Sequence, residues 1–505
     1  MGCEITTCSF VTAPLTSHSQ PVPDRRKELF LFVTALEQVQ RNLAPRLCHR
    51  LRCNRFGVTL LLVSLSHAAL EQVQSNLAPR LCDRLRCNRY LLLIKTRYGD
   101  EAEILVEEIL RHGQDTASDV ILQAFSRLNN TPKVGKADLG SLRDKFSLLV
   151  TKQFIMRCPS PTDEEGTVPV LTVKERELYL PPDLNLKNLL AMEQGQGGST
   201  GDEGVYWRIN LDRFHQEFRD QIMVSAIERR IDADAGELMR LLLQQMYLRT
   251  EPWAAISNPV PYTELKEVIR KQSSHPQLGV YLDQYLKVME EDLSKFISKV
   301  GDSAGGQYSV NIKNSFTELT WTTIENIVLE RSGSKAARIF RLIRAKKFAE
   351  QEQIQQVAMI PAKECKLLTY KLLEESFLQM QELRKSLAAN VPNKTFFLFH
   401  IELDQVARMV LEVCYKALFN ALTRRDHEHK ENRRLIEKHQ RIESITQSMR
   451  EQGADQEQLT EIEEMLTPPE TTLLGKIQTM IKRLSEAELQ LDETVFVLQL
   501  YLSYL

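Results

Sequence analysis

The sequence predicts a mainly α protein with small β-ribbons: tandem modules of helices, each closed by a ribbon, followed by a C-terminal helical hairpin with coiled-coil character. Two patterns predict this fold class. Apolar residues recur at helical spacing after Tyr90, and three sets of such helices each end in two short β-prone runs joined by a turn. After Ile401 the β-prone runs stop, so the rest of the chain is expected to be helical.

The clearest module covers residues 332–401. A stop signal at Ser332 and Gly333 precedes Ser334, which is placed to cap a new helix. A second short helix follows. Pro361 suits the first position of a third helix, because its ring fixes φ and its missing N–H would have no partner there. Three helices and a ribbon are the order of a winged helix, and a small α+β domain of no particular kind is the alternative. The ribbon strands are expected in Phe377–Leu383 and Thr395–Ile401.

Two earlier stretches repeat this order. In residues 90–180, the helices are followed by a predicted strand at Gln153–Arg157. Val168–Val173 is expected to be its partner strand in the ribbon. Residues 181–204 lose the apolar periodicity and are rich in Gly, Gln and Ser, so they are predicted to be a flexible linker. In residues 205–331 the pattern recurs. Its helices are expected around Leu211–Ile222, Leu238–Leu242 and Leu278–Met289, and its ribbon flanks Gly301–Gly306.

The glycine-rich loop Gly301–Gly306 has two catalytic alternatives, a phosphate-binding loop and the nucleophile loop of trypsin-like proteases. No Gly-Lys-Ser/Thr follows it, and Ala304 breaks the protease spacing. A turn between two strands of a wing explains the glycines without further assumptions.

Residues 1–89 are atypical, because Ala35–Phe56 recurs almost verbatim as Ala69–Tyr90 at an offset of 34 residues. Tetratricopeptide arrays share this period but keep a degenerate pattern over about three or more copies. A local duplication or an error in the assembled gene sequence explains the near-identity better. Pro45 and Pro79 each interrupt a potential helix, so this region is predicted to be poorly packed.

The duplication also copies a pair of cysteines separated by four residues. Structural zinc sites favour closer pairs and four committed ligands, so no metal site is predicted. The pairs are Cys48/Cys53 and Cys82/Cys87.

Residues 402–505 are predicted to form an antiparallel helical hairpin. An apolar stripe from Leu403 continues past a polar middle to Met449, which predicts one helix of roughly 70 Å. Thr467-Pro468-Pro469-Glu470 combines a cap, a first-turn proline and a capping-box acid, and Ser485 with Glu488 repeats the capping device.

Composition limits the function classes. The net charge of −2 excludes a basic field over the whole chain, so any nucleic-acid contact must come from a local patch. Nine scattered cysteines and the lack of a secretory leader predict an intracellular chain, and the run Gly57–Leu65 is far shorter than the roughly 20 residues of a membrane-spanning helix. No pattern for catalysis, metal or cofactor is recognised, so a non-enzymatic protein is expected.

The candidate binding residues are basic residues on the module at 332–401. Three lie on its first helix, two on the third helix, which winged helices usually present to DNA, and two lead into the wing. They could neutralise phosphates without reading bases, although a charged helix face is more often only solvated. These residues are Lys335, Arg338 and Arg341, then Lys363 and Lys366, then Arg384 and Lys385.

Four segments carry a resemblance to a known family. They are Gly204–Asp220 (GVYWRINLDRFHQEFRD), Ala337–Leu342, Ala358–Glu364 and Glu431–Leu435. Over about residues 90–505 the chain resembles the winged-helix subunit of eukaryotic RNA polymerase III often called RPC-three, which is similar to the large subunit of the general factor TFIIE.

The resemblance implies a non-catalytic nuclear protein with tandem extended winged helices and a C-terminal coiled coil. Such a subunit sits with two partner subunits, as a heterotrimer, on the clamp of the polymerase's largest subunit. It helps to recruit the factor TFIIIB and to open DNA at small-RNA genes (tRNA, 5S rRNA), with weak contact to single-stranded or melted promoter DNA. Two departures stand out: residues 1–89 do not look like the family's first winged helix, and the linker before Gly204 is short and lacks a basic tract.

Two other classes remain as alternatives. A PCI-type scaffold of a large complex also combines helices with a winged helix, but it places the helical repeats first. A sequence-specific winged-helix regulator is disfavoured by the near-neutral charge. The domains expected on the leading interpretation are residues 1–89 (atypical), 90–180, 205–331 and 332–401 (winged helices), 181–204 (linker) and 402–505 (helical hairpin).

Overall fold

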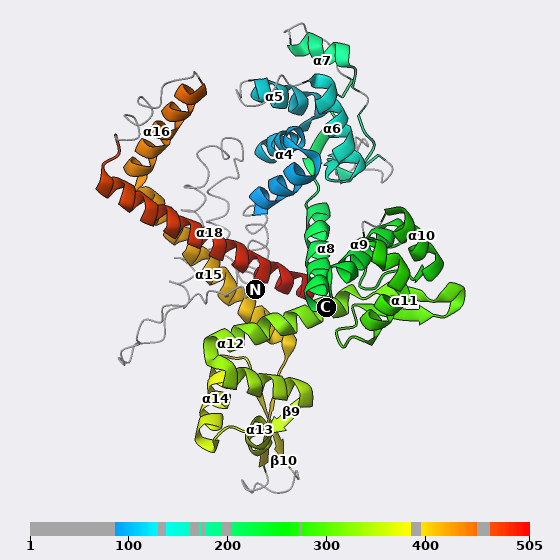
Figure 1. Ribbon diagram of the computed structural model, residues 1–505, viewed down its shortest axis with the longest axis vertical. Helices are drawn as coiled ribbons and strands as arrows, with labels where there is room; N and C mark the ends of the chain where they lie inside the picture. The colour runs from blue at the N-terminus through cyan, green and yellow to red at the C-terminus, as the bar shows by residue number, and fades with distance from the viewer. Residues whose placement is uncertain are drawn as a thin grey trace, which may run out of the picture. The chain divides into compact units, whose positions relative to one another are not determined.

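The computed structural model describes residues 86–129, 138–161, 171–172, 177–182, 184–193, 201–202, 204–272, 275–384, 395–451 and 465–505 (Figure 1). These residues form three modules of helices with a small antiparallel sheet, and a C-terminal helical region. The predicted fold class is confirmed. The duplicated stretch lies outside the described residues, except for its last five, residues 86–90, which belong to a helix spanning residues 86–98. The expectation of poor packing, made for residues 1–89, is therefore wrong for Arg86, whose side chain is 2% exposed.

The first module has a three-stranded sheet in the order β1-β5-β2, and this corrects the predicted ribbon. β2 pairs with β5, which lies beyond the predicted linker; of the expected partner strand Val168–Val173, the described residues Leu171 and Thr172 form β4, which pairs with β3. The physical reason is Trp207 on β5, which is fully buried and packs edge-on against Phe146. The elements are α4 (Asp100–His112), β1 (Asp115–Thr116), α5 (Ala117–Asn129), α6 (Leu139–Thr151), β2 (Ile155–Arg157), β3 (Ser160–Pro161), β4 (Leu171–Thr172) and β5 (Tyr206–Ile209).

The predicted linker, residues 181–204, also contains structure. It includes α7 (Leu186–Glu193), whose Leu189 is buried against the first module. Near its end, the Asp202 carboxylate accepts hydrogen bonds from the backbone N and the Oγ of Ser118, at 2.8 and 3.0 Å. Asp202 thus satisfies a free amide and meets the positive end of the dipole at the start of α5. The prediction of a flexible linker is wrong for these parts.

The second module follows a long helix, α8 (Leu211–Arg230), and has the sheet order β6-β8-β7. The predicted helices and ribbon are present, but β6 and α10 were missed. The glycine-rich loop is a wing turn, as predicted: it joins β7 to β8, and Gly305 and Gly306 have φ of 84° and 115°, which favour glycine. The elements are α9 (Ala233–Arg249), β6 (Val260–Pro261), α10 (Tyr262–Gln272), α11 (Pro276–Glu291), β7 (Ile297–Gly301) and β8 (Gln307–Val310).

The third module begins inside α12 (Ile312–Lys346), which is kinked at Gly333 (φ 83°, ψ 172°). The predicted stop is therefore a kink, and the chain continues as a helix on both sides. The first strand, β9, was missed, and the sheet order is β10-β11-β9. Pro361 immediately precedes the third helix instead of opening it. The elements after α12 are β9 (Phe348–Glu350), α13 (Gln351–Ala358), α14 (Ala362–Glu374), β10 (Gln379–Arg384) and β11 (Thr395–His400).

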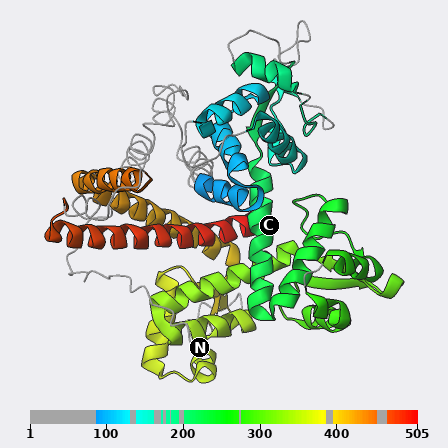
Figure 2. The same ribbon diagram turned by 45° about the horizontal axis from the view of Figure 1, so that its top comes forward.

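The C-terminal region contains α15 (Leu403–Glu431), α16 (Arg433–Glu451) and α18 (Pro468–Ser503). α15 and α18 lie side by side in Figures 1 and 2 and are antiparallel, because Tyr501 bonds to Asp404 whereas Glu488 bonds to Arg425 farther along α15. The predicted 70 Å helix is interrupted at Asn432, between α15 and α16. The capping box of Thr467 and Glu470 is present as predicted.

The second predicted capping device, at Ser485 and Glu488, does not start a helix. Both residues lie inside α18, which has neither Gly nor Pro near them to end the preceding helix. A capping signature needs a break before it.

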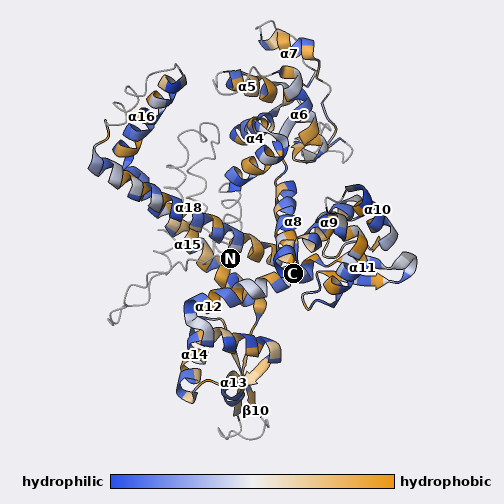
Figure 3. Cartoon of the chain, in the orientation of Figure 1, coloured by the Kyte–Doolittle hydropathy of each residue, from blue (hydrophilic) through white to orange (hydrophobic). Residues whose placement is uncertain are grey.

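Two hydrophobic cores meet on the last turns of α18. Phe496, Leu500 and Tyr504 belong to the core of the first two modules, whereas Val495 and Leu498 belong to the core of the third module and α15. Figure 3 shows this C-terminal end of α18 as more hydrophobic than its N-terminal half. No helix among the described residues is both long and apolar enough to cross a lipid bilayer.

Candidate nucleic-acid and partner interface

The third helix of the third module, α14, has one buried and one exposed face. Its inner face buries Cys365, Thr369 and Leu372. The outer face repeats at helical spacing and combines two cations, an aliphatic side chain and an aromatic ring. Its members are Lys363, Lys366, Leu367 and Tyr370, called the α14 stripe below.

The two predicted lysines of α14 are available for binding. Both are exposed, and Lys363 forms no ion pair or hydrogen bond with any residue that the structure describes. The Lys366 Nζ lies 6.0 Å from the centre of the Tyr370 ring, at the edge of cation–π range.

The three predicted basic residues of α12 are engaged within the module. Lys335 forms an ion pair of 2.6 Å with Glu364, Arg338 donates to the Ala358 carbonyl at 3.2 Å, and Arg341 pairs with Glu325. The charges of Lys335 and Arg341 are therefore partly neutralised by their acidic partners, and Arg338 keeps its charge with one donor already used.

The two predicted wing residues, Arg384 and Lys385, come at the end of β10 in the sequence. Arg384 is the last residue of β10, where its backbone pairs with Thr395, and its side chain lies outside the described part of the chain. Lys385 also lies outside it.

Two members of the α14 stripe were missed by the sequence analysis, Leu367 and Tyr370. Leu367 is 70% exposed, which is unusual for leucine at the centre of a helix. Tyr370 packs edge-on against Phe399, with ring centres 6.1 Å apart, and remains half exposed. Their spacing of four and seven residues from Lys363 was a signal that would have identified them.

The described residues offer little for catalysis or metal binding. No three His, Cys, Asp or Glu side chains among them are grouped to hold a metal ion. Burial raises the pKa of the Cys365 thiol, and it raises that of Cys414 to about 11, so neither is an activated nucleophile.

Comparisons with protein families and known proteins agree with this geometry. Residues 324–401 match the C-terminal winged-helix domain of POLR3C, residues 434–497 match the helical hairpin domain of DNA-directed RNA polymerase III subunit RPC3, and residues 161–319 match RNA polymerase III subunit RPC82. The chain is 38% identical to DNA-directed RNA polymerase III subunit RPC3 of Rattus norvegicus over 439 residues, which cover 82% of each chain. The chain belongs to the RPC3 family.

Two further relatives show the same extent of similarity. The Homo sapiens RPC3 subunit is 38% identical over 440 residues and the Danio rerio subunit is 37% identical over 443, with 82% of each chain covered in both comparisons. The resemblance seen in the sequence is therefore confirmed, and the α14 stripe lies within the RPC3-family winged helix at residues 324–401.

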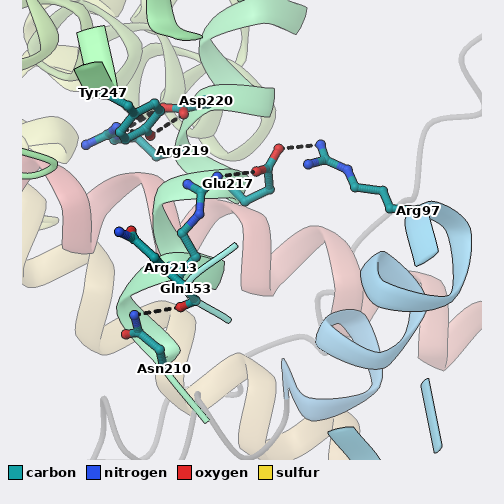
Figure 4. Close-up of polar contacts among 8 residues, drawn as sticks. All are labelled: Arg97, Gln153, Asn210, Arg213, Glu217, Arg219, Asp220 and Tyr247. Atoms are coloured by element: carbon teal, nitrogen blue, oxygen red, sulfur yellow. Dashed lines mark hydrogen bonds and ion pairs between the residues drawn. The ribbon is translucent and has the colours of Figure 1, made fainter. Parts of the chain in front are cut away.

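The segment Gly204–Asp220, which carried much of that resemblance, forms β5 and the start of α8 in this RPC3-family chain. Figure 4 shows its polar contacts in both directions. Toward the first module, Asn210 donates to the Gln153 carbonyl at 2.9 Å and Glu217 pairs with Arg97.

Toward the second module, the same segment holds a buried arginine (Figure 4). Arg219 is fully buried and donates to Asp220, Tyr247 and the Tyr504 hydroxyl, the last at 3.0 Å. Burial alone would lower its pKa, but the charge of Asp220 and the two tyrosines outweigh burial and raise the pKa of Arg219. The segment therefore joins α8, α9 and the C-terminus, which is a structural role.

Proposed function

We propose that this RPC3-family chain is a non-catalytic subunit of RNA polymerase III in the nucleus. It acts in a heterotrimer with two partner subunits on the clamp of the largest subunit. There it helps to recruit TFIIIB and supports promoter recruitment, DNA opening and initiation at small-RNA genes (tRNA, 5S rRNA). Identity to RPC3 subunits over 82% of the chain is the observation that carries the proposal.

The proposal keeps three winged helices, expected at residues 90–180, 205–331 and 332–401, and a helical hairpin at 402–505; the first winged helix also includes β5, Tyr206–Ile209. Residues 1–89 form the atypical N-terminal part. The test is affinity purification of the full chain from nuclear extract. Co-purification of the polymerase III catalytic subunits is expected, and recovery of proteasome-lid or signalosome subunits in their place would favour a PCI-type scaffold.

Within this function we assign weak binding of melted DNA to the α14 stripe. Its lysines supply charge for phosphates, and Tyr370 supplies an aromatic surface on which a base can stack, the combination typical of single-strand binding. Lys335, Arg338 and Arg341 contribute less because they are already paired. Arg384 and Lys385, which lead into the wing in the sequence, are kept as candidates for phosphate contact.

The test replaces both Lys363 and Lys366 with Glu and measures single-stranded DNA binding across salt concentrations. Two lost phosphate contacts should weaken binding and reduce the slope of log K against log[salt] by about 1.4. Tyr370→Ala should cost roughly 1–3 kcal/mol with the slope unchanged, because stacking releases no counterions.

The matched control is Lys476→Glu with Lys482→Glu on α18, which changes the net charge equally at two exposed positions. Co-purification with the polymerase should persist in both double variants. If both weaken DNA binding equally, the effect comes from net charge and the α14 stripe is not the site.

A further inference from the structure

The third helix of the second module, α11, has an apolar and acidic outer face, in contrast to the basic outer face of α14. The inner face of α11 buries Leu278, Leu282, Leu286 and Met289 against the module core. Its outer face leaves large apolar side chains uncovered. Val280, just before the kink at Tyr281, is 75% exposed, and Val288 is 50% exposed; after the kink, Gln284 and Val288 share one helical row.

The apolar surface continues beyond this row. Tyr281, where the helix is kinked, is half exposed, and Leu293, in the turn after α11, is 90% exposed. Exposed leucines and valines occurring singly need no explanation, but several on one helix and its following turn are typical of a protein-binding surface.

The charges on α11 are acidic. Within α11, Pro276–Glu291, there are three acidic residues, Asp283, Glu290 and Glu291, against one basic residue, Lys287. Lys287 is itself 3.9 Å from Glu291. By contrast, α14 carries Lys363, Lys366 and Lys371 against Glu364 and Glu374.

This charge balance is unfavourable for nucleic acid. Binding to phosphates draws on Lys and Arg that replace counterions, and the outer face of α11 offers carboxylates instead. An apolar row with acidic neighbours is complementary to an amphipathic helix whose apolar side is flanked by Lys or Arg.

We infer that the outer face of α11 docks a basic amphipathic helix of another polymerase III subunit. This inference rests on the proposed function, and it names the chemistry of one partner contact. Val280 and Val288 would pack against apolar residues of that helix, and Asp283, Glu290 and Glu291 would face its cations.

The first test uses labelled synthetic helical peptides and fluorescence anisotropy with the full chain. A leucine/lysine amphipathic peptide should bind, and a leucine/glutamate peptide of the same pattern should not. Val280→Asp with Val288→Asp should weaken binding of the leucine/lysine peptide at least tenfold. The matched control, Leu473→Asp with Leu489→Asp on α18, changes two exposed leucines and should leave the affinity unchanged. Equal losses in the two double variants, or preference for the leucine/glutamate peptide, would overturn the inference.

The second test places a benzophenone photo-crosslinker at Gln284 in the chain assembled into polymerase III. A crosslink to a Lys- or Arg-rich segment of another subunit is expected. Crosslinks to DNA or to a second copy of this chain would overturn the inference. A polymerase that contains the chain but gives no crosslink from Gln284 would also overturn it, while leaving the proposed function standing. If the chain does not enter the polymerase, the proposed function fails, and the peptide measurement still decides whether α11 binds basic helices.

Discussion

The Asp492 carboxylate on α18 forms ion pairs with two arginines of the helix at residues 86–98. Arg86 Nε donates to one carboxylate oxygen at 2.7 Å, and Arg89 donates to the other at 2.5 Å. The Arg86 side chain is 2% exposed and that of Asp492 is 9% exposed, so this is a buried ion pair. The guanidinium carbon of Arg86 also lies 4.8 Å from the centre of the Phe496 ring.

We predict that Asp492→Asn loosens this helix from α18. Removing one partner of a buried pair costs roughly 3–5 kcal/mol, because the remaining charge is left without compensation. Asn keeps the shape and one acceptor, and Arg89 is partly exposed, so we expect the lower end, about 3 kcal/mol. At about 1.4 kcal/mol for each factor of ten, amide exchange of residues 86–98 should become roughly a hundredfold faster.

Hydrogen exchange measured on the full chain at neutral pH reports this local opening without requiring the whole chain to unfold in one step. The neighbouring residue provides the control, since Glu493 is 64% exposed and 3.9 Å from Arg89. Glu493→Gln should change exchange less than about fivefold, as expected for an exposed pair. If the two variants accelerated exchange equally, the buried pair would not be what holds the helix.

Two further predictions concern the C-terminal region. Tyr504→Phe removes an acceptor of the buried Arg219 and should lower the free energy of unfolding by about 1–2 kcal/mol, measured by denaturant titration, whereas Tyr206→Phe at a half-exposed position should have no effect. Lys438, together with the Thr467 backbone and hydroxyl, lowers the pKa of Glu470 from its ordinary 4.5 to about 2, so the contribution of this carboxylate is complete above pH 4.5 and is lost as the pH falls toward 2. Titration of the Glu470 carboxyl by NMR should show a midpoint at about 2. Lys438→Ala should move this midpoint toward 4.5. If the control Lys482→Ala moved it as well, a general charge effect and not the Lys438 contact would explain the lowered pKa.

The helices of the fold could be predicted because their information is local. The stripe of Cys365, Leu368 and Leu372, the capping box of Thr467 and the glycines between β7 and β8 each specify their own conformation within a few residues. Five strands were missed for the opposite reason. β1, β3, β6 and β9 have two or three residues each, and β5 has four, too few to show a clear alternating pattern.

The main error of the sequence analysis was the partner of β2, because the true partner strand lies far from β2 in the sequence. Val168–Val173 was chosen as the partner of β2 because it came next, whereas β5 lies some distance beyond it and brings a tryptophan that the core requires. The pairing of β5 with β2 was therefore not accessible from local pattern alone.

The candidate interface stays a prediction, but the structure distinguishes among its residues. Basic residues were read from composition, but the structure separates Lys363 and Lys366, which are exposed, from Lys335 and Arg341, whose acidic partners lie 29 and 16 residues away in sequence. Ion pairs between residues this far apart in sequence determine which lysines and arginines can still contact a ligand. They cannot be predicted from the spacing of residues along one helix. The α11 surface was missed because Val280 and Val288 look like core residues until the position of the buried stripe is known.

The end of the duplicated stretch shows how few residues decide which copy enters the core. The two copies share both arginines, Arg52 and Arg55 in the first and Arg86 and Arg89 in the second. Only the second ends in a tyrosine, and the Tyr90 hydroxyl bonds to His215 at 2.9 Å while its ring packs against Phe214. The second copy also runs directly into Leu93 and Ile94, which are buried, whereas the corresponding positions after Phe56 are Thr59 and Leu60. The first copy thus has the same two arginines but lacks the tyrosine hydroxyl and the complete apolar stripe, so we expect the segment ending in Tyr90 to bind α8 and α18 more strongly than the first copy would.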